Sequence, residues 1–122
     1  MGLHSVDYLA RNPDRILQNH EIAGALSVSA NHLAKIHQRL VRSGLLVAVR
    51  GPAGGFKLAK PANEITLLSV VKAIESDFEP TKCLLGRQEC LRSACILGEL
   101  SARINNEVKS YLSHTTAADL AR

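Results

Sequence analysis

The sequence changes its periodicity at residue 45, and this change constrains the fold more than any other feature. The residues before it show the spacing of an amphipathic helix, whereas residues 45–50 are rich in β-forming side chains. Residues 51–55 read Gly-Pro-Ala-Gly-Gly, which is a turn composition, and residues 56–59 alternate in polarity again. The pattern predicts a two-stranded hairpin directly after a helix, with Arg50 and Lys57 on its strands.

The helix before this hairpin is predicted over residues 30–42. Ser29 is placed to cap its first turn, and Ser43-Gly44 supplies the left-handed end that helices often need. Its apolar stripe consists of Leu33, Ile36, Leu40 and Val41. Its open face carries Asn31, Lys35, Gln38, Arg39 and Arg42.

Two shorter helices are predicted to precede it. The first follows apolar residues at helical spacing from Leu3 and ends at Asn12-Pro13, because proline disfavours helix in the residue before it. The second covers residues 21–26, with Asn19 as its expected cap, and a tight turn at residues 27–29 follows. This order of elements predicts a winged helix-turn-helix in residues 1–60, within a mainly α fold that has a two-stranded wing.

Residues 61–122 are predicted to add a linker helix, a cysteine loop and a long dimerisation helix, forming one compact domain with the first part. Thr66 is expected to cap the linker helix, which would end near Asp77. From Ala94 onward the apolar residues keep helical spacing: Leu97, Leu100, Ile104, Val108 and Leu112. So small a domain cannot cover a stripe of that length, so we predict a symmetric homodimer.

Charge divides the chain into two unequal parts. The net charge is +4, and residues 18–60 hold six basic residues against the single acidic residue Glu21, a local charge of +5. Residues 61–122 are close to neutral, with seven basic and eight acidic residues. A basic part joined to a neutral part predicts a nucleic-acid-binding region with a second function attached, and a solvated basic helix face is the alternative.

Composition excludes several other classes of protein. The longest apolar run, Leu45 to Val49, is far too short for a transmembrane helix, and we expect no membrane partner. Asp7 and Arg11 interrupt the early apolar stretch, so no signal peptide is visible and a cytoplasmic location is expected. The chain has only four aromatic residues, which argues against base stacking on single-stranded nucleic acid.

On double-stranded DNA, base-edge contacts specify sequence and phosphate contacts supply position and affinity. The base-reading candidates are the first-turn residues Ser29, Asn31 and His32. The phosphate-contact candidates are Lys35, Arg39, Arg42 and Lys57. Arg50 is expected to enter the minor groove, and Gly54 and Gly55 to let the wing tip approach the DNA backbone. A plain surface role is the alternative for His32, Gln38 and Arg42.

These residues resemble the Rrf-two family of bacterial transcription regulators, of the IscR and NsrR type. The resemblance covers nearly the whole chain, including residues 29–36, 43–45 and 115–120. Its most specific parts are the Arg-Gly-x-x-Gly-Gly sequence at 50–55 and three cysteines just before a long helix. It implies a homodimeric, sequence-specific DNA-binding regulator that is not an enzyme. It also implies an iron–sulfur cluster that senses redox state, nitric oxide or iron–sulfur status; clusterless thiol sensors and members that act through a partner enzyme are the alternative.

The cysteines themselves favour a cluster. Cys83, Cys90 and Cys95 have six and four residues between them, unlike the paired spacing of a zinc site. Wide spacing suits a loop around a [2Fe-2S] or [4Fe-4S] cluster, and the neighbouring basic residues favour thiolates. A thiol or disulfide switch, a small thiol enzyme and purely structural cysteines are the alternatives.

Three thiolates leave the cluster one ligand short, and the sequence leaves the fourth ligand open. The position three residues after Cys95, where the IscR type has a histidine, is Gly98. An acidic ligand used by some nitric-oxide sensors would align before Met1. The remaining candidates are Glu99, Asp7 or His4 of the partner subunit, or a small molecule.

Overall fold

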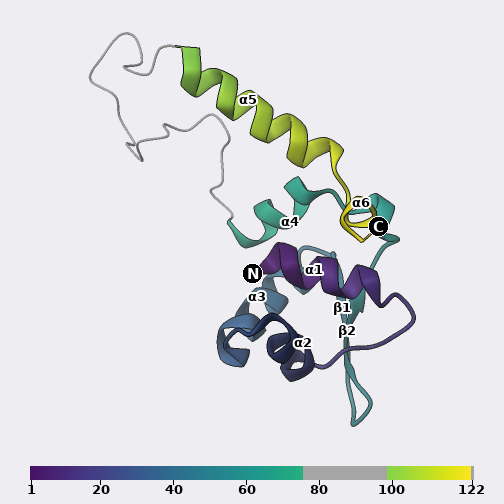
Figure 1. Cartoon of the computed structure of the whole chain (residues 1–122). Helices are drawn as coiled ribbons and strands as arrows, with labels where there is room; N and C mark the ends of the chain where they lie inside the picture. Colours follow the sequence, from purple (N-terminus) through teal and green to yellow (C-terminus); the bar gives the residue numbers. More distant parts are fainter. Residues whose placement is uncertain (76–98, 122) are drawn as a thin grey trace.

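A computed structural model describes residues 1–75 and 99–121, and Figure 1 shows how their elements are arranged. The elements in chain order are α1 (Gly2–Arg11), α2 (Asn19–Leu26), α3 (Ala30–Arg42), β1 (Leu46–Val49), β2 (Gly55–Leu58), the 3₁₀ turn η1 (Ala62–Glu64), α4 (Leu67–Ile74), α5 (Glu99–His114) and α6 (Ala117–Leu120). The predicted fold class is confirmed: three helices precede a two-stranded antiparallel wing. Within these residues no helix is both long enough and apolar enough to span a bilayer.

One apolar core joins the helix-turn-helix to the elements after the wing. Its buried side chains come from α1, the segment before α2, α2, α3, β1, the segment after η1, α4 and α6, and include Val6, Leu9, Leu17, Ile22, Leu33, Leu40, Leu46, Ile65, Val70 and Ala117. The predicted stripe of α3 faces this core, since Leu33, Ile36 and Leu40 are buried. Residues from both halves of the chain therefore hold the position of α3.

The ends of α3 follow the local signals in the sequence. The Ser29 side chain accepts a hydrogen bond from the His32 backbone N–H at 3.3 Å, which caps the first turn. Gly44 has φ +78°, so it supplies the left-handed residue expected after the helix. Ser27 is also left-handed, with φ 56°, and turns the chain from α2 into α3.

The predicted cap of α2 was wrong by one residue. Gln18 is the N-cap, and its backbone N–H donates to the Glu21 carboxylate at 3.3 Å, while Asn19 is the first helical residue. The Asn19 side chain is turned toward α3 instead, where it finds two partners. Tertiary partners thus replaced the local capping role for which its residue type is suited.

The wing pairs with the chain in front of α2 as well as with itself. Within the hairpin Leu46 lies opposite Leu58 and Val49 opposite Gly55. Leu17 and Phe56 then exchange two backbone hydrogen bonds, of 3.0 and 2.7 Å. Gly55, at φ +153°, allows this contact, because a Cβ there would overlap the backbone of Leu17. The orientation of the wing relative to α2 is therefore held by backbone pairing.

Beyond the wing, α4 packs against α1 and α3, and α5 projects away from this group (Figure 1). Thr66 caps α4 as predicted, and α4 ends at Ile74. The expected end of this helix near Asp77 lies outside the described residues. Ala94 and Leu97 of the predicted dimerisation helix also lie outside them. The Leu67 N–H donates to the Thr115 carbonyl at 2.9 Å, which fastens the end of α5 to the start of α4.

Candidate nucleic-acid interface

The outward face of α3 carries four exposed polar side chains in one row. Asn31, Lys35, Gln38 and Arg42 are separated by four, three and four residues, so they share one side of the helix, opposite the buried stripe. Within residues 1–75 and 99–121, none of the four makes a hydrogen bond or an ion pair. The row therefore presents two amides and two cations to solvent. We call these four residues the outer row.

For two members of the outer row, Gln38 and Arg42, the sequence also allowed a surface role without DNA contact. The structure aligns them with Asn31 and Lys35, which belonged to the predicted DNA-binding set. Their helical spacing was the available signal, because position 38 follows position 31 by seven residues and position 42 follows position 35 by seven. We therefore add Gln38 to the candidate interface and keep Arg42, a phosphate-contact candidate from the sequence, in it.

His32 and Arg39 lie on a different side of α3, toward α1 and α4. Both line a cavity of about 480 Å³ between these helices, and Lys35 of the outer row lines it as well. The guanidinium of Arg39 donates through Nη1 to the backbone carbonyl of Ile74 at 2.6 Å. Arg39 is thus tied to the last residue of α4, and its phosphate contact stays a prediction.

In the wing, Arg50 and Lys57 are exposed. Gly54 is buried inside the turn, where its N–H donates to the Gly51 carbonyl at 2.9 Å and a Cβ would overlap the Val49 carbonyl. Gly55 packs on Leu17. Contacts within the chain thus account for the Gly54–Gly55 pair, which the sequence alone had related to a close approach to DNA.

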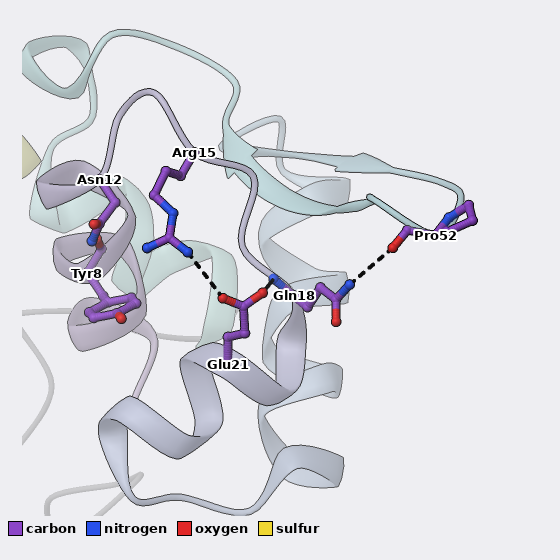
Figure 2. Close-up of polar contacts among 6 residues, drawn as sticks. All are labelled: Tyr8, Asn12, Arg15, Gln18, Glu21 and Pro52. Carbon is purple, nitrogen blue, oxygen red and sulfur yellow. Dashed lines mark hydrogen bonds and ion pairs between the residues drawn. The ribbon is translucent and has the colours of Figure 1, made fainter.

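Figure 2 shows that the wing tip is also tied to the start of α2. Gln18 donates through Nε2 to the Pro52 carbonyl at 3.3 Å. Glu21 accepts from the Gln18 N–H through one carboxylate oxygen and from Arg15 Nη2, at 3.4 Å, through the other. Sequence reasoning missed Gln18 because its partner is 34 residues away and neither residue type marks the pair.

His37 is a buried polar side chain beneath this surface. Its Nε2 lies 2.6 Å from Ser5 Oγ, its Nδ1 lies 2.9 Å from Asn19 Oδ1, and its ring centre lies 4.6 Å from that of Phe56. Burial lowers the pKa of His37 to about 4, so the ring is neutral at neutral pH. It therefore joins α1, α2, α3 and β2 without a charge.

This environment predicts a loss of stability in mild acid. The unfolded chain binds a proton at His37 near its ordinary pKa of 6.5 and the folded chain only near 4, so stability falls as pH drops between these values. The expected loss attributable to His37 is about 3 kcal/mol. Urea unfolding at pH 7, 5.5 and 4 measures it, with His37→Gln subtracting the contribution of the carboxylates. Parallel pH curves for the two proteins would contradict the prediction.

The predicted metal ligands Cys83, Cys90 and Cys95 lie outside the described residues. In the part of the chain that is described, no group of three or more histidine, cysteine or acidic side chains is close enough to hold a metal ion. Of the fourth-ligand candidates, Asp7 accepts from Arg11 Nε at 3.0 Å, and Glu99 is exposed at the start of α5.

Comparison with known proteins decides the family. One family model, Rrf2, described as an iron-dependent transcriptional regulator, matches residues 1–122. The chain belongs to the Rrf2 family. This confirms the resemblance seen in residues 50–55 and identifies the chain as a member of a family of transcriptional regulators.

Individual Rrf2 relatives agree with this assignment. A protein of Aquifex aeolicus named as an HTH-type transcriptional regulator is 31% identical over 122 residues, covering 98% of this chain and 85% of the relative. IscR of Pectobacterium atrosepticum is 31% identical over 101 residues, 82% of this chain and 61% of IscR. The structure of CymR, the global cysteine regulator of B. subtilis, superimposes with a TM-score of 0.82 at 25% identity, covering 98% of this chain and 89% of CymR. The winged helix-turn-helix fold is thus shared with a solved regulator.

Proposed function

We propose that this Rrf2 protein regulates transcription by binding a specific duplex DNA sequence through the outer row of α3 and through the wing. The observation that carries the proposal is the outer row itself: four exposed polar side chains on the second helix of a helix-turn-helix, without partners in the described chain. A recognition helix placed in the major groove needs such a face.

The chemistry of the outer row divides the work between specificity and affinity. The amides of Asn31 and Gln38 suit bidentate pairing with adenine, which presents a donor and an acceptor in the major groove. Lys35 and Arg42 supply charge for phosphate contacts, and Arg50 at the end of β1 supplies the charge favoured in a narrow minor groove. We place this function in the cytoplasm.

Selection from a pool of random duplexes tests this function. We expect enrichment of a two-part site, with an affinity that falls steeply as salt rises, because bound phosphates release counterions. In the same assay Arg50→Ala is expected to weaken binding by roughly tenfold or more without changing the oligomeric state. Lys72→Ala, which removes an exposed cation from α4, is the control and is expected to bind as the wild type does.

Two outcomes would count against the interface. Absence of any enriched sequence would contradict the proposed function as a whole. Unaltered operator binding by Arg50→Ala would remove the wing from the mechanism while leaving α3 in it.

We also propose that a second copy of the chain covers α5. Leu100, Val108 and Tyr111 are 44%, 40% and 60% exposed, which is unusual for apolar and aromatic side chains that follow one helix face. A dimer places two copies of α3 against two half-sites, as a two-part operator requires.

For the cysteines we propose an iron–sulfur cluster, [2Fe-2S] or [4Fe-4S], held by Cys83, Cys90 and Cys95. Three thiols beside basic residues are a suitable donor set for iron, and the family is described as iron-dependent. When bound, such a cluster supplies sensitivity to redox state, nitric oxide or iron–sulfur status. Iron and sulfide analysis of anaerobically purified protein tests this. Iron-free protein after reconstitution would instead favour a thiol sensor or action through a partner enzyme.

A further inference from the structure

The side chain of Asn19 holds α3 at two points. Its Nδ2 donates to the backbone carbonyl of Ala30 at 2.9 Å, and its Oδ1 lies 2.9 Å from Nδ1 of His37. Ala30 and His37 are seven residues apart, so the two contacts lie two turns apart on the side of α3 that faces α2. One residue of α2 therefore restrains both the position and the rotation of α3.

The Ala30 carbonyl, at one end of this group, determines the direction of each hydrogen bond in it. A carbonyl only accepts, so the Asn19 amide nitrogen must face Ala30 and the Asn19 oxygen must accept from His37. His37 therefore carries its proton on Nδ1, and Nε2 accepts from the Ser5 hydroxyl at 2.6 Å. In the described residues no buried side-chain nitrogen or oxygen lacks a partner, so each buried polar atom in this group is hydrogen-bonded.

This series of hydrogen bonds ends at the first turn of α3, where contacts with DNA bases are expected to begin. The carbonyl of Ala30 belongs to the peptide that joins Ala30 to Asn31, and Ser29 caps the same turn. The bond from Asn19 thus holds the peptide plane between two candidate base readers. A bidentate contact to a base depends on such orientation, whereas a phosphate contact tolerates more movement.

We propose that Asn19 is a positioning residue for base recognition: it orients the first turn of α3 without touching DNA. The inference rests on the proposed DNA-binding function. It predicts that changes at Asn19 reduce the preference for the operator more than they reduce general affinity for duplex DNA.

Two substitutions separate the two bonds of Asn19. Asn19→Ala removes both. Asn19→Asp keeps an acceptor for His37 but replaces the donor to Ala30 by a carboxylate oxygen, and its charge at the N-terminus of α2 favours folding. Asn12→Ala is the matched control, because it removes a comparable part-buried bond, from Asn12 Nδ2 to the Tyr8 carbonyl at 2.8 Å, on α1 (Figure 2 shows both residues).

The experiment compares binding to the selected operator and to random duplex at the same salt concentration. We expect Asn19→Ala to lose about tenfold or more in operator affinity and to keep random-duplex affinity within about twofold. Because Asn19→Asp adds a negative charge that weakens binding to any duplex, the ratio of its operator affinity to its random-duplex affinity is compared, and this ratio is expected to fall by about tenfold. Asn12→Ala is expected to keep both. Without DNA, amide hydrogen exchange at His32 and Leu33 is expected to be faster in the Asn19 variants than in the control.

Equal losses on operator and random duplex would overturn the proposal, as would operator binding by Asn19→Asp that matches the wild type. If Asn19→Ala does not fold, Asn19→Asp decides the question alone. If the wild-type protein selects no sequence, the proposed function is contradicted. The exchange rates of the Asn19 variants then test the positioning of α3 separately. Unchanged exchange rates would overturn the positioning role of Asn19.

Discussion

Gly55→Ala is expected to lower the free energy of unfolding by about 3 kcal/mol and to reduce DNA affinity sharply. The added Cβ would overlap the backbone of Leu17, and φ +153° is strained for any residue with a side chain. Relief requires β2 to move away from Leu17, which breaks the two backbone bonds between Leu17 and Phe56. The wing, which carries Arg50, would then lose its orientation relative to α2.

Urea unfolding and titration with the selected duplex measure the two effects of Gly55→Ala. Gly24→Ala is the control, because Gly24 lies within α2, is exposed, and a Cβ there meets no atom within 4 Å. It is expected to stabilise the protein by roughly 0.5–1 kcal/mol, since alanine favours helix over glycine. A Gly55→Ala protein as stable as the wild type, with unchanged DNA binding, would show that the wing does not need its contact with Leu17.

Val108→Asp is expected to convert the proposed dimer to a monomer. Val108 lies on the same side of α5 as Leu100 and Tyr111, and burying an unpaired carboxylate between two copies costs several kcal/mol. Because the monomer meets only one half-site at a time, operator affinity is expected to fall by about 100-fold. Random-duplex binding, which depends mainly on charge, is expected to change much less.

Asn106→Asp provides the matched control for this prediction. It introduces the same charge on the same helix, two residues away and therefore on nearly the opposite side, at an exposed position. Sedimentation of the three proteins at one concentration separates dimer from monomer. A Val108→Asp protein that keeps the wild-type mass, or a wild-type monomer, would exclude this face of α5 as the dimer contact.

Local features of the sequence were enough to predict most of the fold. The bounds of α3 came from a capping serine, a regular apolar stripe and a left-handed glycine, each of which acts within a few residues. The hairpin came from β-rich runs on either side of a turn, and the structure pairs those runs in the expected antiparallel way. The charge of residues 18–60 and the sequence at 50–55 led to the family.

The partners of single side chains that suit more than one role could not be predicted from the sequence. Asparagine is a favoured N-cap residue, yet Gln18 is the N-cap of α2 and the side chain of Asn19 forms a hydrogen bond with α3. Arg39 has a partner that its residue type does not indicate, the carbonyl of Ile74 at the end of α4. In both cases a partner far along the chain competes with the local or solvent-facing role, and residue type alone does not reveal that partner.

The sequence by itself determined the order of the elements through the wing, the bounds of α3, the basic character of the reading region and the family, because these depend on periodicity, backbone preference and composition. Only the tertiary structure decided that the Arg39 guanidinium turns toward the end of α4, why Gly55 is a glycine, and how His37 and Asn19 brace the helix. Those properties depend on contacts between residues that lie 11 to 39 positions apart, such as Asn19 with Ala30 and Leu17 with Phe56. Such pairs form only when the helices and the wing pack around one core.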